Sequence, residues 1–498
     1  MRILTTKQVR LSDAFTIKNG ISSYELMERA AHKCYEFISD FLQEDSSVLV
    51  LAGNGNNGGD GWAIARMLLD AGFNVKVVFL NGDDLSEDNR INKDRFLEIG
   101  GECEMYLERE QPFEADVIID SLFGSGLSRV LEGDLKDVVD LINHSKSLVF
   151  SIDSPSGFFT DEPMPEKALA VEASYTLCFH SPRLMFFFPE SQRYLGNWEV
   201  LDIGLIQPDD KDFIKDSLPY SLSLVEELKG RIQPRSPFAH KGNFGHALLI
   251  GGSEGKYGAM ILAAKACVRS GAGLTTLLLP SQAMNIAQIS VPEAMLILSD
   301  GEKHISGNLN LELASSIGFG PGAGFHDDTA KTLKGVIQQG ISKLVIDADG
   351  LNILSENKTW LAFLPPGTIL TPHPGEMDRL TDKSDSSFER LQNARKLSRK
   401  FSVVVVLKGA YTAVCFPSGE VHFNVTGNPG MAKGGSGDAL TGIITALLAQ
   451  GYPNTEAAIL GVALHGLAGD IASFQIGEES MLPSDLIEKL GEAFEMLK

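Results

Sequence analysis

The amino-acid sequence predicts an α/β protein of two domains, each built around a mainly parallel β-sheet. Short apolar runs of strand type alternate with longer runs of helix type along most of the 498 residues. This alternation is typical of βαβ units. It stops once, in a polar segment, and then restarts. Glycine-rich loops follow several of the strand-like runs, at the sheet edge where open α/β sheets bind their ligands.

The first half carries the alternation from residue 47 to residue 205. Its strand-like runs are 47–52, 75–80, 116–122, 148–157 and 198–205, and its helix-like runs are 61–72, 94–101 and 135–145. Residues 207–235 are polar, charged and proline-containing, and show no clear buried-strand signal before Arg235. We therefore expect the domain boundary near residue 218.

The second half restarts the same pattern without repeating the first half in sequence. Its main runs are 246–253, 259–273, 274–280, 315–324, 343–354, 367–380, 403–416 and 428–451. This half is again predicted to be α/β.

The composition limits the classes of partner. The chain has 43 Lys and Arg against 65 Asp and Glu, a formal charge of −22, which disfavours nucleic acid and anionic membrane surfaces. Glycine is abundant, with 50 residues, or 50/498 ≈ 10% against about 7% on average. Backbone N–H groups in glycine loops bind small anions without a basic surface, so an anionic ligand remains compatible with this charge.

The cysteines and the N-terminus indicate a cytoplasmic protein. The five cysteines are widely spaced and form no CxxC pair, which favours reduced buried thiols over a disulfide framework or a zinc site. The first 15 residues lack the apolar core of a signal peptide. No apolar run approaches the ~18 residues of a transmembrane helix, so none is expected.

The first glycine loop, GNGNNGGDG at 53–61, follows a predicted strand and opens a predicted helix. Its glycines formally match GxGxxG, a weak signal for a dinucleotide pyrophosphate that an ordinary tight turn also gives. Asn56, Asn57 and Asp60 add side-chain oxygens that such a cofactor loop does not need. These oxygens suit a hard cation or a ribose hydroxyl.

Two more strand ends point to the same sheet edge. Asp120 stands in IIDSLFGSGLSR, and Asp153 and Ser156 stand in SIDSPSG. Each aspartate is individually well explained as the N-cap of the next helix. Their combination with the loop Gly124–Gly126 favours a ligand site.

Together with the opening segment LTTKQVRLSDAFTIKNGISSYELMERAA, these motifs resemble the epimerase domain of the NAD(P)H-hydrate repair proteins, the YjeF N-terminal type, over residues 1–217. The resemblance implies a Rossmann-like three-layer α/β domain that interconverts the R and S epimers of NAD(P)H hydrate. It implies K⁺ ligation by Asn57, Asp120 and Ser156, and an acid/base role for Asp153. The implied substrate contacts are Asn56, Asn57, Gly58, Gly59, Asp60, Gly124, Ser125, Gly126, Leu127, Ser128, Arg129, Val130 and Asp153.

The segment after the next strand departs from that family. The family commonly has KPG there, and this chain has Ser181-Pro182-Arg183-Leu184. Arg183 keeps the positive charge without the chemistry of lysine.

The second half carries NPGMAKGGSGDALTG at 428–442. Successive backbone N–H groups before a helix form an anion hole, and Asp438 beside them is placed to deprotonate a hydroxyl during phosphoryl transfer. The simpler alternative is a glycine-rich turn capped by Asp438. Lys408 and Thr412 follow an apolar strand, and two prolines fix the backbone of His373.

In family order, HKGNFGHALLIGGSEGKYGAMILAAKACVRSGAGL, GPGAG, DADGLN, TPHPGE, LKGAYT and NPGMAKGGSGDALTG resemble the ADP/ATP-dependent NAD(P)H-hydrate dehydratases, over residues 222–498. The resemblance implies a ribokinase-like α/β domain that phosphorylates the hydrate and then eliminates phosphate, with Asp438 as base and Mg²⁺ on the nucleotide. The implied substrate contacts are Ala259, Gly322, His373 and Asp438, and the implied nucleotide contacts are Lys408, Gly409, Ala410, Tyr411, Thr412 and Gly437.

The sequence therefore predicts a bifunctional enzyme that repairs NAD(P)H hydrates and forms a homo-oligomer. The fused two-domain form suggests ADP as the phosphate donor, giving AMP and phosphate. Two alternatives remain. One is a ribokinase-superfamily kinase of a vitamin alcohol, whose glycine loop is the same. The other is an N-terminal half that binds a dinucleotide without catalysis.

Overall fold

The computed structural model describes residues 1–80, 85–106, 111–126, 129–208, 219–307 and 311–498. The chain forms two compact units. One comprises Arg2–Leu218, and the other comprises Pro219–Lys498 together with Met1.

The N-terminal unit contains a seven-stranded sheet whose pairs are all parallel, in the order β3-β2-β1-β4-β5-β6-β7. This is the strand order of a doubly wound Rossmann-type sheet, whose direction reverses between β1 and β4. Its strands are β1 (Ser47–Ala52), β2 (Asn74–Phe79), β3 (Glu102–Met105), β4 (Val117–Ser121), β5 (Leu148–Ile152), β6 (Tyr175–Phe179) and β7 (Asn197–Leu201).

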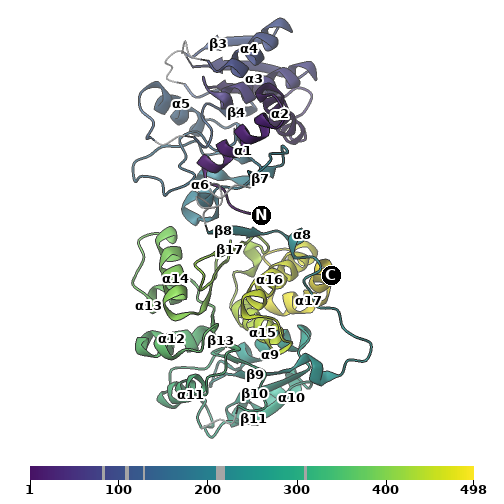
Figure 1. Ribbon diagram of the computed structural model, residues 1–498, viewed down its shortest axis with the longest axis vertical. Coiled ribbons are helices and arrows are strands. Elements are labelled where there is room, and N and C mark those ends of the chain that lie inside the picture. Colours follow the sequence, from purple (N-terminus) through teal and green to yellow (C-terminus); the bar gives the residue numbers. More distant parts are fainter. Residues whose placement is uncertain (81–84, 107–110, 127–128, 209–218, 308–310) are drawn as a thin grey trace. The chain divides into compact units, whose positions relative to one another are not determined.

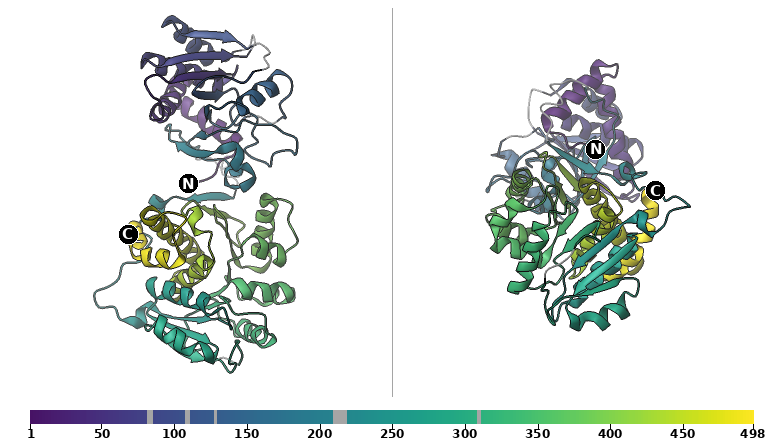
Figure 2. Two further views of the ribbon diagram at one scale, coloured as in Figure 1. Left: turned by 180° about the vertical axis from the view of Figure 1, so that it is seen from behind. Right: turned by 60° about the horizontal axis from the view of Figure 1, so that its bottom comes forward.

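Helices cover both faces of this sheet (Figures 1 and 2). On β1, Val48 and Val50 face a core shared with α1 to α4, whereas Leu49 and Leu51 face a core shared with α5. The prediction of a three-layer α/β domain is thereby confirmed. The helices are α1 (Thr6–Lys18), α2 (Ser23–Ser39), α3 (Asn56–Asp70), α4 (Glu87–Glu98), α5 (Asp134–Asn143) and α6 (Gln192–Leu195), with 3₁₀ turns at Leu184–Phe187 and Pro189–Ser191.

The C-terminal unit contains a ten-stranded sheet in the order β11-β10-β9-β12-β13-β14-β15-β16-β17-β8. The pairs from β11 to β15 are parallel, and β16 is antiparallel to both of its neighbours. The strands are β8 (Tyr220–Ser223), β9 (His246–Ile250), β10 (Leu274–Leu279), β11 (Met295–Leu298), β12 (Ser316–Phe319), β13 (Leu344–Ile346), β14 (Ile369–Leu370), β15 (Val404–Leu407), β16 (Ala413–Cys415) and β17 (Val421–Asn424).

The largest core of this unit packs α15, α16 and α17 against β13, β14 and β15. Helices α11 to α14 lie across the sheet from them (Figure 1). The helices are α8 (Val225–Leu228), α9 (Tyr257–Arg269), α10 (Met284–Ser290), α11 (Asp327–Gln338), α12 (Ala348–Glu356), α13 (Pro374–Leu380), α14 (Ser387–Phe401), α15 (Ser436–Ala449), α16 (Asn454–Ile476) and α17 (Pro483–Leu497), with 3₁₀ turns at Lys241–Phe244, Ser281–Ala283, Lys358–Phe363 and Pro429–Met431.

One expectation about the polar segment 207–235 is wrong. The segment contains a strand, β8, which is mostly buried and pairs in parallel with β17. The sequence signal was missed because the strand has only four residues and forms the edge of its sheet.

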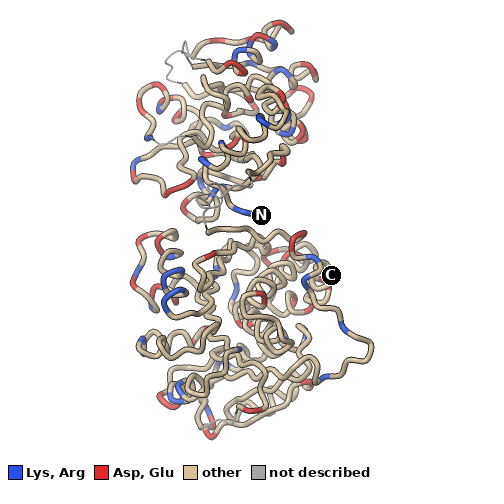
Figure 3. The backbone as a smooth tube through the Cα atoms, viewed as in Figure 1, with Lys and Arg blue, Asp and Glu red and all other residues tan. Residues whose placement is uncertain are grey.

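Helix α16 is, among the described residues, long and apolar enough to cross a membrane by length and composition. However, 67% of its apolar stretch is buried inside the unit, as in the core helix of a globular domain. All five cysteines are free. Acidic and basic residues are interspersed along the described backbone of both units (Figure 3).

The contact between α15 and α9 gives a test of packing. A Cβ at Gly442 would lie 2.1 Å from the carbonyl oxygen of Ala263, so we expect Gly442→Ala to destabilise the C-terminal unit by about 1–3 kcal/mol. Gly491, in α17, is exposed and has open space around it. Gly491→Ala is the matched control and should stabilise by about 0.5–1 kcal/mol. Calorimetric unfolding midpoints check both, and equal midpoints for the two variants would contradict this packing.

Candidate active sites

The N-terminal candidate site lies where the strand order of the first sheet reverses. β1 runs into the glycine loop, and α3 begins at Asn56. A Cβ at Gly53 would lie 1.9 Å from the carbonyl oxygen of Leu122, which follows β4. The loops after β1 and β4 therefore touch through their backbones, at the place where sheets of this order bind ligands.

The first turn of α3 brings unsatisfied polar groups to this place. Both polar side-chain atoms of Asn57 are buried without a hydrogen-bond partner, an arrangement that calls for a ligand or ion. Asp60, one turn on, is 8% exposed. Burial, reinforced by the charge of Asp153, raises its pKa well above the usual value. Gly58 and Gly59 pack in the same turn and are buried.

Asp153 is held from two sides. Its Oδ2 accepts a hydrogen bond from the backbone N–H of Ser125 at 2.7 Å, and its Oδ1 accepts one from Arg183 at 3.0 Å. Arg183 is fully buried. The backbone of Asp153 has φ 65°, a strained value for a non-glycine residue of the kind found at functional sites.

The glycine loop after β4 joins this cluster. A Cβ at Gly124 would lie 2.7 Å from Oδ2 of Asp153 and 3.5 Å from the side chain of Asn57. Residues 124–126, Asn57 and Asp153 are thus brought together. Arg129 and Val130 are exposed, and the predicted contacts Leu127 and Ser128 lie outside the described residues.

Asp120 and Ser156 form a second, fully buried group of oxygens. The Ser156 hydroxyl lies 2.5 Å from Oδ1 of Asp120 and 3.1 Å from the carbonyl oxygen of Phe123. Oδ2 of Asp120 accepts from the hydroxyl of Ser151 and from the backbone N–H of Ser156. Burial raises the pKa of Asp120, and the hydrogen bonds, which lower it, do not cancel this effect.

Sequence reasoning missed two residues of α1 that face this site. A Cβ at Gly126 would lie 2.1 Å from a guanidinium nitrogen of Arg10, which adds a cation beside the glycine loop. Burial, followed by the charge of Asp153, raises the pKa of Asp13 to about 6. The two residues are three apart and so share a helix face, but nothing in the sequence places α1 against residues 124–126.

The C-terminal candidate site is centred on the start of α15. Gly435 precedes the helix with φ 103°, and Asp438 lies in its first turn. A Cβ at Gly437 would lie 3.2 Å from the ammonium of Lys408. The structure thus places a lysine beside a helix N-terminus, two features that favour a phosphate.

Lys408 is anchored by a buried carboxylate. Its ammonium lies 2.9 Å from Oδ1 of Asp347 and 3.8 Å from Glu376. Thr371 and Thr441 each donate a hydrogen bond to Asp347. Burial lowers the pKa of Lys408, but the charges of Asp347 and Glu376 outweigh it, so the net shift is upward and the lysine stays protonated.

Asp438 has the pKa of a usable base. Burial raises it from 3.8 to about 6, helped by the charge of Asp347 and opposed by Lys408. A carboxylate with a pKa near the working pH accepts a proton more effectively than an ordinary surface aspartate.

The loop after β12 borders the same site. Gly322 has φ 58°, and a Cβ there would lie 3.2 Å from that of Ala259, so these two predicted contacts are neighbours. The carbonyl of Gly322 accepts from Ser253. Asp349 accepts from the N–H of Gly324 at 2.8 Å.

His373 has a local structural role. Its Nδ1 accepts from the backbone N–H groups of Gly375 and Glu376 at the start of α13, and half of its side chain is exposed. Residues 408–412 form the turn between β15 and β16, closed by a hydrogen bond from the Thr412 hydroxyl to the Gly409 carbonyl. Lys433 donates to the carbonyls of Glu479 and Met481.

Known proteins match this chain over its whole length. The protein described as bifunctional NAD(P)H-hydrate repair enzyme from Thermofilum pendens is 33% identical, with 100% of this chain and 97% of that protein covered. The protein of the same description from Moorella thermoacetica is 34% identical, with 94% of this chain and 92% of that protein covered.

The chain belongs to the family of bifunctional NAD(P)H-hydrate repair enzymes.

Two family models match this repair enzyme, one in each of the two units that carry a candidate site. The model described as YjeF-related protein N-terminus matches residues 23–185, and the model described as NAD(P)H-hydrate dehydratase matches residues 247–492. A solved ribokinase-like superfamily protein from Enterococcus faecalis is 30% identical, with a TM-score of 0.50, and covers 56% of this chain and 96% of its own. The predicted family and the ribokinase-like fold of the second half are confirmed.

The pair of Arg183 and Asp153 gives a test of the N-terminal site. We expect Arg183→Met to destabilise this unit by about 2–4 kcal/mol, because the carboxylate of Asp153 loses its buried partner. Arg193 pairs with Glu172 on the surface, where the side chains are 61% and 41% exposed. The control Arg193→Met should cost less than about 1 kcal/mol. Urea unfolding followed by tryptophan fluorescence compares the stabilities of the two variants. An Arg183→Met variant as stable as the control would contradict a stabilising ion pair between Arg183 and Asp153.

Proposed function

We propose that residues 1–217 interconvert the R and S epimers of NAD(P)H hydrate, and that residues 222–498 dehydrate the S epimer with ADP as phosphate donor. The observation that carries the proposal is Asp438, a half-buried carboxylate with a pKa of about 6, in the first turn of a helix whose N-terminus adjoins Lys408. A general base and an anion site at one helix end suit phosphoryl transfer to a hydroxyl.

Dehydration proceeds in two steps at this site. Asp438 accepts the proton of the C6 hydroxyl as that oxygen attacks the terminal phosphorus of ADP, and AMP leaves. The phosphate ester at C6 then departs as inorganic phosphate, a far better leaving group than hydroxide. Loss of a ring proton restores the double bond of NAD(P)H.

The nucleotide is held by Lys408–Thr412 and Gly437, where the ammonium and the N–H groups at the start of α15 meet. The hydrate lies against Ala259, Gly322 and His373. Mg²⁺ would be held by the phosphates of the nucleotide together with one carboxylate. Asp347, beside Asp438, would supply that carboxylate and leave Asp438 unligated to accept the proton. The ion would neutralise charge on the transferred phosphoryl group.

In the epimerase unit, Asp153 moves the proton beside the altered nicotinamide ring. Arg183 and the Ser125 N–H orient its two oxygens, and Arg10 adds positive charge beside Gly126, in the loop that would meet phosphate. The orphaned amide of Asn57 with the oxygens of Asp120 and Ser156 fits K⁺, which prefers neutral and carboxylate oxygens. K⁺ would bind substrate oxygens there. A homo-oligomer and a cytoplasmic location stay predictions from the sequence.

The pKa of Asp438 sets the pH dependence of dehydration. Only the ionised carboxylate accepts a proton, so kcat/KM, which reports the free enzyme, should halve near pH 6 and fall about tenfold per pH unit below that. An ordinary aspartate would place this decline near pH 4. Rates measured from pH 4.5 to 8 check the midpoint. Asp438→Asn should lose nearly all activity and the decline with it; a variant retaining the same profile would exclude Asp438 as the base.

One assay tests both units at once. With ADP, Mg²⁺ and a mixture of R and S hydrates, the wild type should convert all hydrate to NAD(P)H, seen as recovered near-ultraviolet absorbance of the reduced ring. Asp153→Asn should convert only the S fraction, because it cannot renew that epimer. Asp438→Asn should convert none.

The control for that assay is Asp140→Asn, at an exposed carboxylate beside His144, which should behave as the wild type. Complete conversion by Asp153→Asn would exclude it as the epimerase acid/base and favour an N-terminal module without catalysis. Phosphorylation of a vitamin alcohol with no recovery of NAD(P)H would overturn the dehydratase in favour of a kinase.

A further inference from the structure

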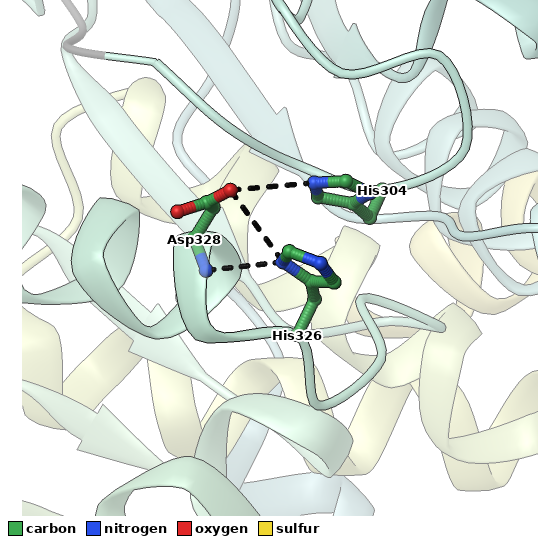
Figure 4. A group of neighbouring side chains, drawn as sticks. All are labelled: His304, His326 and Asp328. Carbon is green, nitrogen blue, oxygen red and sulfur yellow. Dashed lines mark hydrogen bonds and ion pairs between the residues drawn. The ribbon is translucent and has the colours of Figure 1, made fainter.

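Two histidines and an aspartate meet outside both candidate active sites. His304 lies in the loop after β11, and His326 and Asp328 lie at the start of α11. The imidazole rings stack with centroids 3.6 Å apart and planes 19° apart. Figure 4 shows both rings turning a nitrogen toward the same carboxylate oxygen.

The distances between these atoms are those of ligands that share one ion, and the stacked rings would tilt so that both in-plane lone pairs point at it. Nε2 of His304 and Nδ1 of His326 each lie 3.6 Å from Oδ2 of Asp328, beyond the range of good charge-assisted hydrogen bonds. Two ligands of one zinc ion, each about 2.1 Å from it and about 110–120° apart, are separated by about 3.4–3.6 Å. All three ligand atoms lie within 4.8 Å of one another.

One donor atom already has a weak partner. The backbone N–H of Asp328 donates to Nδ1 of His326 at 3.2 Å, so this nitrogen carries the lone pair of the ring, and that lone pair ligates a metal when the weak hydrogen bond breaks. The ammonium of Lys331 donates a hydrogen bond to Oδ1 of Asp328 at 2.8 Å, which leaves Oδ2 to face the two imidazoles. Asp327 is a second acidic residue in this turn, which offsets the unfavourable field of a helix N-terminus on a cation.

We propose that His304, His326 and Asp328 bind one first-row divalent cation of the zinc class, with water completing its coordination. Two imidazoles and one carboxylate form a donor set that favours Zn²⁺ over Mg²⁺ or Ca²⁺. The proposal is independent of the reactions assigned to the two active sites. Metal binding would replace the weak hydrogen bond by which His326 caps α11. In its place, the metal would link the start of α11 to the loop after β11.

The ion would fasten a loop that borders the dehydratase site. Lys303, next to His304, pairs with Glu254 at 2.7 Å, and its carbonyl accepts from the Glu254 N–H. Ser253, the preceding residue, donates to the carbonyl of Gly322. The metal would therefore tie the loop that contains His304 to the start of α11. Through Lys303, Glu254 and Ser253 it would also stabilise the loop that carries Gly322.

The test counts bound metal on the full-length, tag-free protein. The metal-free protein is dialysed against Zn²⁺ in excess Mg²⁺, and zinc is measured by atomic emission. Wild type should hold one Zn²⁺ more per chain than His304→Gln and than His326→Asn, in which asparagine keeps the N-cap. His144→Gln, a histidine beside Asp140 on the surface, should match the wild type.

Cobalt provides a second measurement. Co²⁺ bound by wild type should give visible d–d absorption that titrates to one equivalent and is lost in His304→Gln, while circular dichroism shows each variant folded. Equal zinc content in wild type and both ligand variants, or no zinc in folded wild type, would overturn the proposal. In that case the three side chains form only a surface ion-pair cluster.

Discussion

Both sites depend on close backbone contact where the strand order of a parallel sheet reverses. In the first sheet the chain after β1 touches the chain after β4 at Gly53, where any side chain would strike the Leu122 carbonyl. In the second sheet a Cβ at Gly251, after β9, would lie 2.4 Å from the Pro321 carbonyl, after β12. In the second sheet the N–H of Gly252 also donates to the Pro321 carbonyl. Only glycine allows such a close approach of two backbones, which explains why glycine gathers at strand ends in this chain.

An acidic protein can offer a small anion only a local cation or backbone N–H groups. Its net charge is −22, yet each site keeps a cation beside its glycine loops: Arg183, fully buried, in the first and Lys408, 20% exposed, in the second. Each cation is held by a carboxylate, Asp153 or Asp347. Since isolated buried charges are costly, these carboxylates hold the two cations in place.

The sequence was sufficient for the α/β class, the two-part pattern and the loops at strand ends, because hydrophobic periodicity and glycine clusters are local signals. Long-range pairings were not readable. Arg183 was noted as a departure from its family, but its bond to Asp153, 30 positions away in sequence, depends on the left-handed backbone of that aspartate. Arg10 and Asp13 were missed because the position of α1 is set by tertiary packing. Strand β8 was missed because four edge residues give too little pattern.

The two acids of the enzyme differ in a way that fits their proposed work. Asp153 accepts hydrogen bonds from a guanidinium and a backbone N–H, which orient it for proton exchange in either direction, as interconversion of epimers requires. Asp438 is instead raised in pKa by burial and by neighbouring carboxylates, while the nearby Lys408 is engaged by Asp347. The ionised form of Asp438 is destabilised by its surroundings, so its protonation during phosphoryl transfer is favourable. The negative charge then moves onto the phosphate, which faces the helix N-terminus.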